Sequence, residues 1–154
     1  MGSGTGSTAS FPPALLPDGN TKSITIHSLE HACAALSAAT ALSCPVILQS
    51  APGAAGNLGA MVFNQIISQA ANQYPQAQCI AILDCADNAG LALNALRNGV
   101  KHISVDLEGQ ALIRISDIAE QSGATLMKIN PLALDLKDVN YSDTSIHDWL
   151  LKDH

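Results

Sequence analysis

Polar residues recur along the chain, each directly after a short apolar run. They are His27, Gln49, Ser50, Asp84, Asp106 and Asn130. A carboxylate can act as a general base, and imidazole, hydroxyl and amide groups can hold a polar ligand by hydrogen bonds. We therefore take Asp84 as the candidate catalytic residue, and His27, Ser50, Asp106 and Asn130 as candidate ligand-binding residues. The alternative is that such residues only favour the turns and helix caps that follow strands.

A glycine-rich loop from Gly53 to Gly59 precedes a helical pattern. Exposed backbone N–H groups at the start of a helix can hold a phosphate, so Gly53 is a further candidate for ligand binding. The loop has neither the GxGxxG spacing nor the Gly-Lys-Ser or Gly-Lys-Thr ending of a Walker A motif. The alternative is a tight connection in which glycine only permits the turns.

Cys85 follows Asp84 directly, so the two residues can supply a base and a thiolate, or a thiolate ligand for a metal. A cysteine at such a position can also be a small buried apolar residue. The other cysteines, Cys33, Cys44 and Cys79, show no CxxC spacing and lie in apolar stretches. We expect reduced thiols, with a Cys44–Cys79 disulfide as the alternative. Histidines form no cluster at metal spacing, so we expect no cofactor.

The elements that must position these residues alternate between strand-like and helix-like patterns. The strand-like runs are residues 23–26, 45–49, 79–83, 103–105 and 124–129. Between them, apolar residues recur at helical spacing, and glycines such as Gly99 and Gly123 end the helices. Successive strand–helix units form a parallel sheet, which binds ligands at the carboxyl ends of its strands. The sequence therefore predicts an α/β fold with about five parallel strands, like a partial TIM barrel or an open flavodoxin-like three-layer sheet.

The length and composition are typical of one domain. The chain has 154 residues, of which 47% are hydrophobic. Residues 1–20 are rich in Gly, Ser, Thr and Pro, and we expect a flexible leader that lacks the features of a secretory signal. Residues 21–154 are expected to form a single α/β domain, in which residues 131–154 are a C-terminal tail with a short helix.

The charge of the chain argues against two classes of partner. The formal net charge is −6, and only 7 Lys and Arg residues are spread through the sequence. A nucleic-acid-binding protein needs a basic surface, as does a protein that binds anionic membranes. No apolar run reaches the roughly 20 residues that span a bilayer. We therefore expect no nucleic-acid or membrane partners, and the expected reduced thiols indicate a cytoplasmic protein.

Several segments, in the same order along the chain, resemble class II fructose-bisphosphate (ketose-bisphosphate) aldolases. Residues 24–30 (ITIHSLE) resemble the first strand of that family and the helix start that follows it. Residues 44–54 (CPVILQSAPGA) resemble the second strand and its Gly-Ala loop, and are the most specific match. Residues 80–85 (IAILDC), 99–106 and 113–129 resemble the segments that follow in the family.

The resemblance implies that Asp84 stands where the family has its catalytic Asp, and Cys85 where it has a zinc-binding His. Cysteine can bind zinc, so zinc is the alternative to no cofactor. The run 124–129 has no Glu where the family carries an acidic residue, and the later barrel strands with their zinc and phosphate ligands have no counterpart here. A closed barrel needs at least about 200 residues. The sequence thus resembles a truncated and degenerate member, and we do not expect an active class II aldolase.

Three functions fit these observations. The first is a non-catalytic aldolase-like domain that binds a small phosphorylated or polar ligand at the carboxyl edge of its sheet. The second is an assembly or regulatory subunit that binds a protein partner. The third is a metal-dependent lyase that is completed by oligomerisation. A homo-oligomer is expected, because the edges of an open sheet must be covered.

Overall fold

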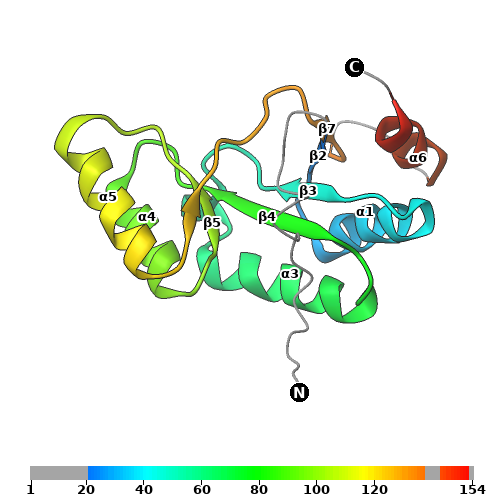
Figure 1. Cartoon of the computed structure of the whole chain (residues 1–154), viewed down its shortest axis with the longest axis horizontal. Coiled ribbons are helices and arrows are strands. Elements are labelled where there is room, and N and C mark those ends of the chain that lie inside the picture. The colour runs from blue at the N-terminus through cyan, green and yellow to red at the C-terminus, as the bar shows by residue number, and fades with distance from the viewer. Residues whose placement is uncertain (1–20, 138–142, 153–154) are drawn as a thin grey trace. The chain divides into compact units, whose positions relative to one another are not determined.

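The computed structural model describes residues 21–137 and 143–152, so the expected leader lies outside the described residues. Helices alternate with parallel strands in an α/β fold, which confirms the predicted fold class (Figure 1). The strands are β2 (Lys22–Thr25), β3 (Val46–Gln49), β4 (Cys79–Asp84), β5 (His102–Ser104), β6 (Thr125–Leu126) and β7 (Leu134–Asp135). The helices are α1 (Leu29–Leu42), α2 (Ala54–Asn57), α3 (Ala60–Gln73), α4 (Ala89–Arg97), α5 (Gly109–Gln121) and α6 (Asp143–Leu151). No helix in this described part is long and apolar enough to cross a membrane.

The strand order of the sheet is β6-β5-β4-β3-β2-β7. Strands β2 to β6 are therefore neighbours in the order in which they occur along the chain. That order is the one found in a TIM barrel, whereas a flavodoxin-like sheet reverses its strand order at one point. Since β6 and β7 stand at the two ends of the order, the sheet of the described residues is open and fits the partial-barrel expectation.

The sixth strand, β7, lies in the tail, where the sequence pattern predicted only a short helix. It pairs in parallel with β2, with Ile24 opposite Leu134 and Thr25 opposite Asp135. A strand of two residues is too short to show the alternating pattern by which strands are predicted. The predicted strand 124–129 is also longer than β6, which contains only Thr125 and Leu126. Lys128 and Ile129 instead form hydrogen bonds with residues at the end of β5.

Contacts along the chain divide it into two compact units, which are described one at a time. Among the described residues, unit 1 comprises residues 21–48, Ile66–Ile80 and those from Leu132 onward. Unit 2 comprises Gln49–Gln65 and Ala81–Pro131.

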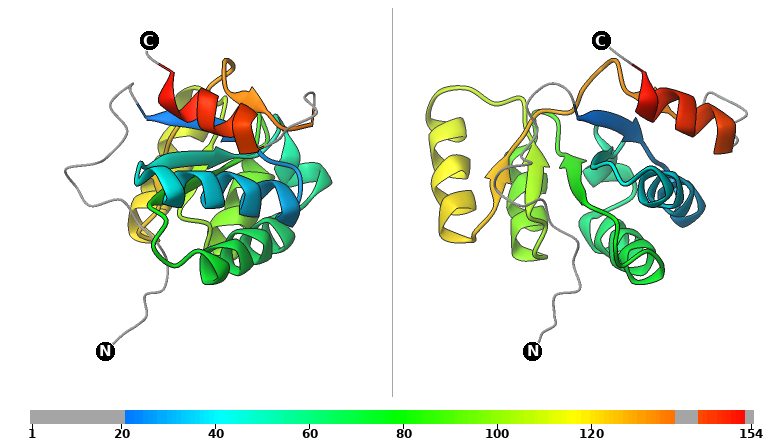
Figure 2. Two further views of the ribbon diagram at one scale, coloured as in Figure 1. Left: turned by 90° about the vertical axis from the view of Figure 1, so that its right-hand side faces the viewer. Right: turned by 45° about the vertical axis from the view of Figure 1, so that its right-hand side comes forward.

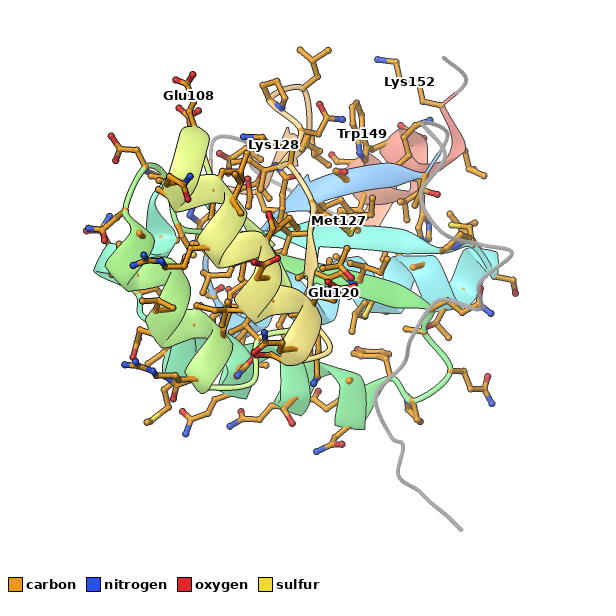
Figure 3. All side chains as sticks on the ribbon, turned by 60° about the vertical axis from the view of Figure 1, so that its left-hand side comes forward. Glu108, Glu120, Met127, Lys128, Trp149 and Lys152 are labelled. Atoms are coloured by element: carbon orange, nitrogen blue, oxygen red, sulfur yellow. The ribbon has the colours of Figure 1, made fainter. Side chains whose placement is uncertain are left out.

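In unit 1, the tail helix α6 packs on α1 (Figure 2). Ser28 caps the start of α1, because its Oγ accepts a hydrogen bond from the N–H of His31. Ile146 of α6 is fully buried. Trp149 donates from Nε1 to the carbonyl of Ser23 at 3.0 Å, and Lys152 lies 5.6 Å from the centroid of its ring (Figure 3). Helix α6 is therefore anchored to both β2 and α1.

In unit 2, α4 and α5 pack side by side next to their strands (Figure 2). Two successive right-handed β–α–β connections in the same direction place their helices on the same face of a sheet. Leu83 pairs with Ile103, and both are fully buried. Asn88 caps the start of α4, where its side-chain oxygen accepts a hydrogen bond from the N–H of Leu91 at 3.0 Å. This register places Asp84 beside Ser104 at the carboxyl ends of β4 and β5.

Candidate functional site

Asp84 is the last residue of β4 and is held by two hydrogen bonds. Its Oδ2 accepts from the backbone N–H of Gly53 at 2.7 Å, and its own N–H donates to Oγ of Ser50 at 2.9 Å. The residue is only 7% exposed. The other carboxylate oxygen has no hydrogen-bond partner in residues 21–137 and 143–152. Asp84 thus has one anchored oxygen and one oxygen that can accept a bond from a ligand.

Ser50 directly follows β3 and is almost fully buried, at 1% exposure. Its N–H donates to the carbonyl of Ile82 at 2.9 Å, so the backbone of β3 continues along β4. The hydroxyl donates to the carbonyl of Ala51 and accepts from the N–H of Asp84. Because its single O–H donor is already used, Ser50 positions Asp84, and direct contact of Ser50 with a ligand stays a prediction.

Gly53 begins the short helix α2 with a φ of 71°, in the left-handed region that favours glycine. The sequence suggested that its N–H could hold a phosphate, but this N–H donates to the carboxylate of Asp84. A phosphate at the same N–H would have to displace a carboxylate and would meet its negative charge. Gly53 therefore supports Asp84 in this structure, and its binding of a ligand stays a prediction.

Cys85 is fully buried next to Asp84. Burial, and then the charge of Asp84, raise the pKa of its thiol to about 11. Zinc binds the thiolate form of cysteine, which such an environment disfavours. The described residues contain no group of three or more His, Cys, Asp or Glu that could hold a metal ion. The residues around Asp84 therefore do not fit the zinc site that the family resemblance implies.

The backbones of Asp106 and Asn130 form hydrogen bonds, and both residues are exposed. The N–H of Asp106 donates to the carbonyl of Ala86 at 2.8 Å. The N–H and carbonyl of Asn130 both bond to the side-chain amide of Gln49, each at 2.9 Å. Roles of the Asp106 and Asn130 side chains in ligand binding stay predictions.

The residues after β6 lie along the carboxyl ends of β5 and β3. Lys128 donates from Nζ to the carbonyl of Val105 (Figure 3), and the N–H of Ile129 donates to Oγ of Ser104 at 3.4 Å. Together with the Gln49–Asn130 bonds, these contacts hold the segment across strand ends within unit 2. The sequence analysis did not single out Ser104 or Lys128. Ser104 could have been found as a polar residue at the end of a short strand.

His27 belongs to unit 1, whereas the other candidate residues belong to unit 2. Its Nε2 lies 2.6 Å from Oδ1 of Asp135 on β7. The structure thus brings Ser50, Gly53 and Asp84 together, and it places His27 in a separate group with Asp135 and His31.

The comparisons with known proteins agree with the segments quoted from the sequence up to residue 106, whereas the segment 113–129 lies outside the matched residues. A search among curated proteins found no match to the chain. The family described as Fructose-bisphosphate aldolase class-II matches residues 21–112, which is more than half of the chain. The match extends from β2 into α5 and includes Ser50, Gly53 and Asp84. The predicted family is therefore confirmed, and the chain belongs to the class II fructose-bisphosphate aldolase family.

Proposed function

We propose that this chain is an aldolase-family domain that binds a small polar ligand through Asp84, at the carboxyl end of β4. The observation that carries this proposal is the carboxylate of Asp84. One of its oxygens is anchored to the N–H of Gly53, and the other has no hydrogen-bond partner in the described part of the chain. A ligand that donates a hydrogen bond to this oxygen would form a charge-assisted bond, which is stronger than a bond between neutral groups.

The chemistry of the site favours ligands with hydroxyl groups. A carboxylate accepts hydrogen bonds and donates none, so it pairs with a hydroxyl of a sugar-like molecule. The proposal is one of binding and not of metal-dependent cleavage. The thiol of Cys85 is buried with a pKa of about 11, and within residues 21–137 and 143–152 no group of three or more His, Cys, Asp or Glu could hold a metal ion.

Ligand-induced stabilisation tests this proposal. Thermal unfolding is measured with dihydroxyacetone and with dihydroxyacetone phosphate, for the wild type and for Asp84→Asn. A ligand at a hundred times its Kd stabilises by about 2.7 kcal/mol. For a chain of this size, that corresponds to a rise in Tm of roughly 5–10 °C. Asp117→Asn is the matched control, because it makes the same change of charge at an exposed position on α5.

We expect the wild type and Asp117→Asn to be stabilised equally, and Asp84→Asn to lose the effect. Equal shifts in all three proteins would show that ligand binding does not use Asp84. The absence of any shift with either compound would contradict the binding function.

A second candidate is a homo-oligomeric assembly role, favoured by the position of β6. This strand stands at one end of the strand order and contains only Thr125 and Leu126. Proteins cover or shorten such edges because their unpaired backbone groups can pair with another chain. Light scattering coupled to size exclusion tests this role, and a monomer at all concentrations would contradict it.

A further inference from the structure

A histidine and a carboxylate form a close pair in unit 1. His27 follows β2, and its Nε2 lies 2.6 Å from Oδ1 of Asp135 on β7. The pairing of Thr25 with Asp135 brings this carboxylate to the end of β2. A hydrogen bond to a charged carboxylate is shorter and stronger than one between neutral groups, which agrees with this short distance. The two side chains are 24% and 32% exposed, so solvent and small molecules can reach the pair.

Each residue of the pair makes a further hydrogen bond, Asp135 through its side chain and His27 through its backbone. Oδ1 of Asp135 also accepts from the N–H of Lys137 at 3.0 Å. The backbone N–H of His27 donates to Nδ1 of His31 at 3.0 Å. Burial alone would raise the pKa of Asp135, but the N–H of Lys137 and the hydrogen bond and charge of His27 outweigh it and lower the pKa. Asp135 is therefore ionised at neutral pH and acts as the acceptor.

The carboxylate determines which nitrogen of His27 is free. An ionised carboxylate only accepts hydrogen bonds, so Nε2 carries the proton, and Nδ1 of a neutral His27 carries the lone pair. This Nδ1 has no hydrogen-bond partner in the described ranges. His31 is arranged differently, because its Nδ1 already accepts the N–H of His27. The two rings meet edge to face, with their centroids 5.6 Å apart.

We propose that His27 and Asp135 form a histidine–aspartate dyad that acts as a general base on small carboxylic esters. Nδ1 of His27 takes a proton from a water molecule as the water oxygen bonds to the ester carbonyl carbon. The resulting imidazolium is stabilised by the Asp135 carboxylate, which keeps its charge. The C–O bond to the alcohol then breaks and the proton passes to the leaving alkoxide, so the ester and water become an acid and an alcohol. None of the residues around Asp84 takes part.

The test uses p-nitrophenyl acetate as the probe and the full chain at pH 7.5. The release of nitrophenolate is measured for the wild type, His27→Gln, Asp135→Asn and His147→Gln. The last variant removes a histidine of α6 that does not belong to the dyad and corrects for background hydrolysis by surface histidines. We expect the rate of nitrophenolate release above background to fall at least tenfold in His27→Gln and several-fold in Asp135→Asn. In His147→Gln this rate is expected to stay unchanged. Asp135→Asn keeps the Oδ1 acceptor and removes the charge.

A second measurement needs no variant and so does not depend on how a variant folds. Diethyl pyrocarbonate acylates unprotonated, accessible imidazole nitrogens, and peptide mass spectrometry reads the modified histidines. We expect His27 to react faster than His31 and His102. A rate with p-nitrophenyl acetate that His27→Gln leaves unchanged, or a His27 that diethyl pyrocarbonate does not modify, would overturn the dyad. Neither result bears on the ligand-induced stabilisation through Asp84, so the two proposals fail separately.

Discussion

Ala86 has a φ of 53°, although it is not a glycine. It follows Asp84 and Cys85 at the end of β4, where the chain turns toward α4. The turn is held by a hydrogen bond from the N–H of Asp106 to the carbonyl of Ala86, and by one from Asn88 to Cys85. The left-handed region costs a residue with a Cβ roughly 1–2 kcal/mol, because the Cβ crowds the following carbonyl. We therefore predict that Ala86→Gly stabilises the protein.

The magnitude follows from two opposing contributions. Ala86→Gly removes about 1–2 kcal/mol of backbone strain from the folded state. It also gives the unfolded chain more freedom, which costs about 0.4–1 kcal/mol. The net gain in the free energy of unfolding is about 0.5–1 kcal/mol, which corresponds to a rise in Tm of roughly 1–4 °C.

Urea denaturation followed by circular dichroism measures this gain, with two matched variants. Ser43 ends α1 with a φ of 53°, so Ser43→Gly is expected to stabilise the protein by a similar amount. Gly99 has a φ of 82°, so Gly99→Ala is expected to destabilise it by about 1 kcal/mol. If Ser43→Gly stabilises the protein while Ala86→Gly does not, the strain assigned to the end of β4 is refuted.

Three further predictions concern hydrogen bonds and pH. Ser50→Ala leaves the buried N–H of Asp84 without its acceptor and is expected to cost about 1–3 kcal/mol in urea denaturation. Gln49→Leu removes two bonds to the backbone of Asn130, so hydrogen exchange at residues 129 and 130 is expected to quicken, and unchanged protection would contradict the contact. Burial lowers the pKa of His102 from its usual 6.5, so the unfolded state binds this proton first as the pH falls. The free energy of unfolding is therefore expected to fall from pH 7 to pH 5, and less steeply in His102→Gln than in the wild type.

The regular part of the fold could be predicted from the sequence because its signals are local. The strands β3, β4 and β5 are apolar runs that end in polar residues, and each begins and ends within one residue of its predicted range. The strand β7 could not be predicted, because its two residues form a strand only by pairing with β2. The end of the predicted run 124–129 was wrong for a related reason. The N–H of Ile129 bonds to the side-chain hydroxyl of Ser104 on β5 and not to a backbone carbonyl of that strand.

The candidate site could be predicted only in part. The carboxyl ends of neighbouring parallel strands meet, which is why Ser50 and Asp84 could be expected close together. The hydrogen bond from Gly53 to Asp84 depends on the conformation of the loop before α2, which no spacing in the sequence specifies. The contact between His27 and Asp135 joins residues that are 108 positions apart, so no local pattern predicts it.

The hydrogen bond between Gly53 and Asp84 also affects where the negatively charged phosphate of a ligand can bind. A backbone N–H that could have bound a phosphate instead binds a carboxylate. Two like charges about 4 Å apart near a protein surface repel by about 4 kcal/mol, so a phosphate is disfavoured beside Asp84. Unit 2 has a positive group at the end of β5, where Lys128 donates to the carbonyl of Val105. A phosphorylated ligand is therefore expected to place a hydroxyl at Asp84 and its phosphate away from the start of α2.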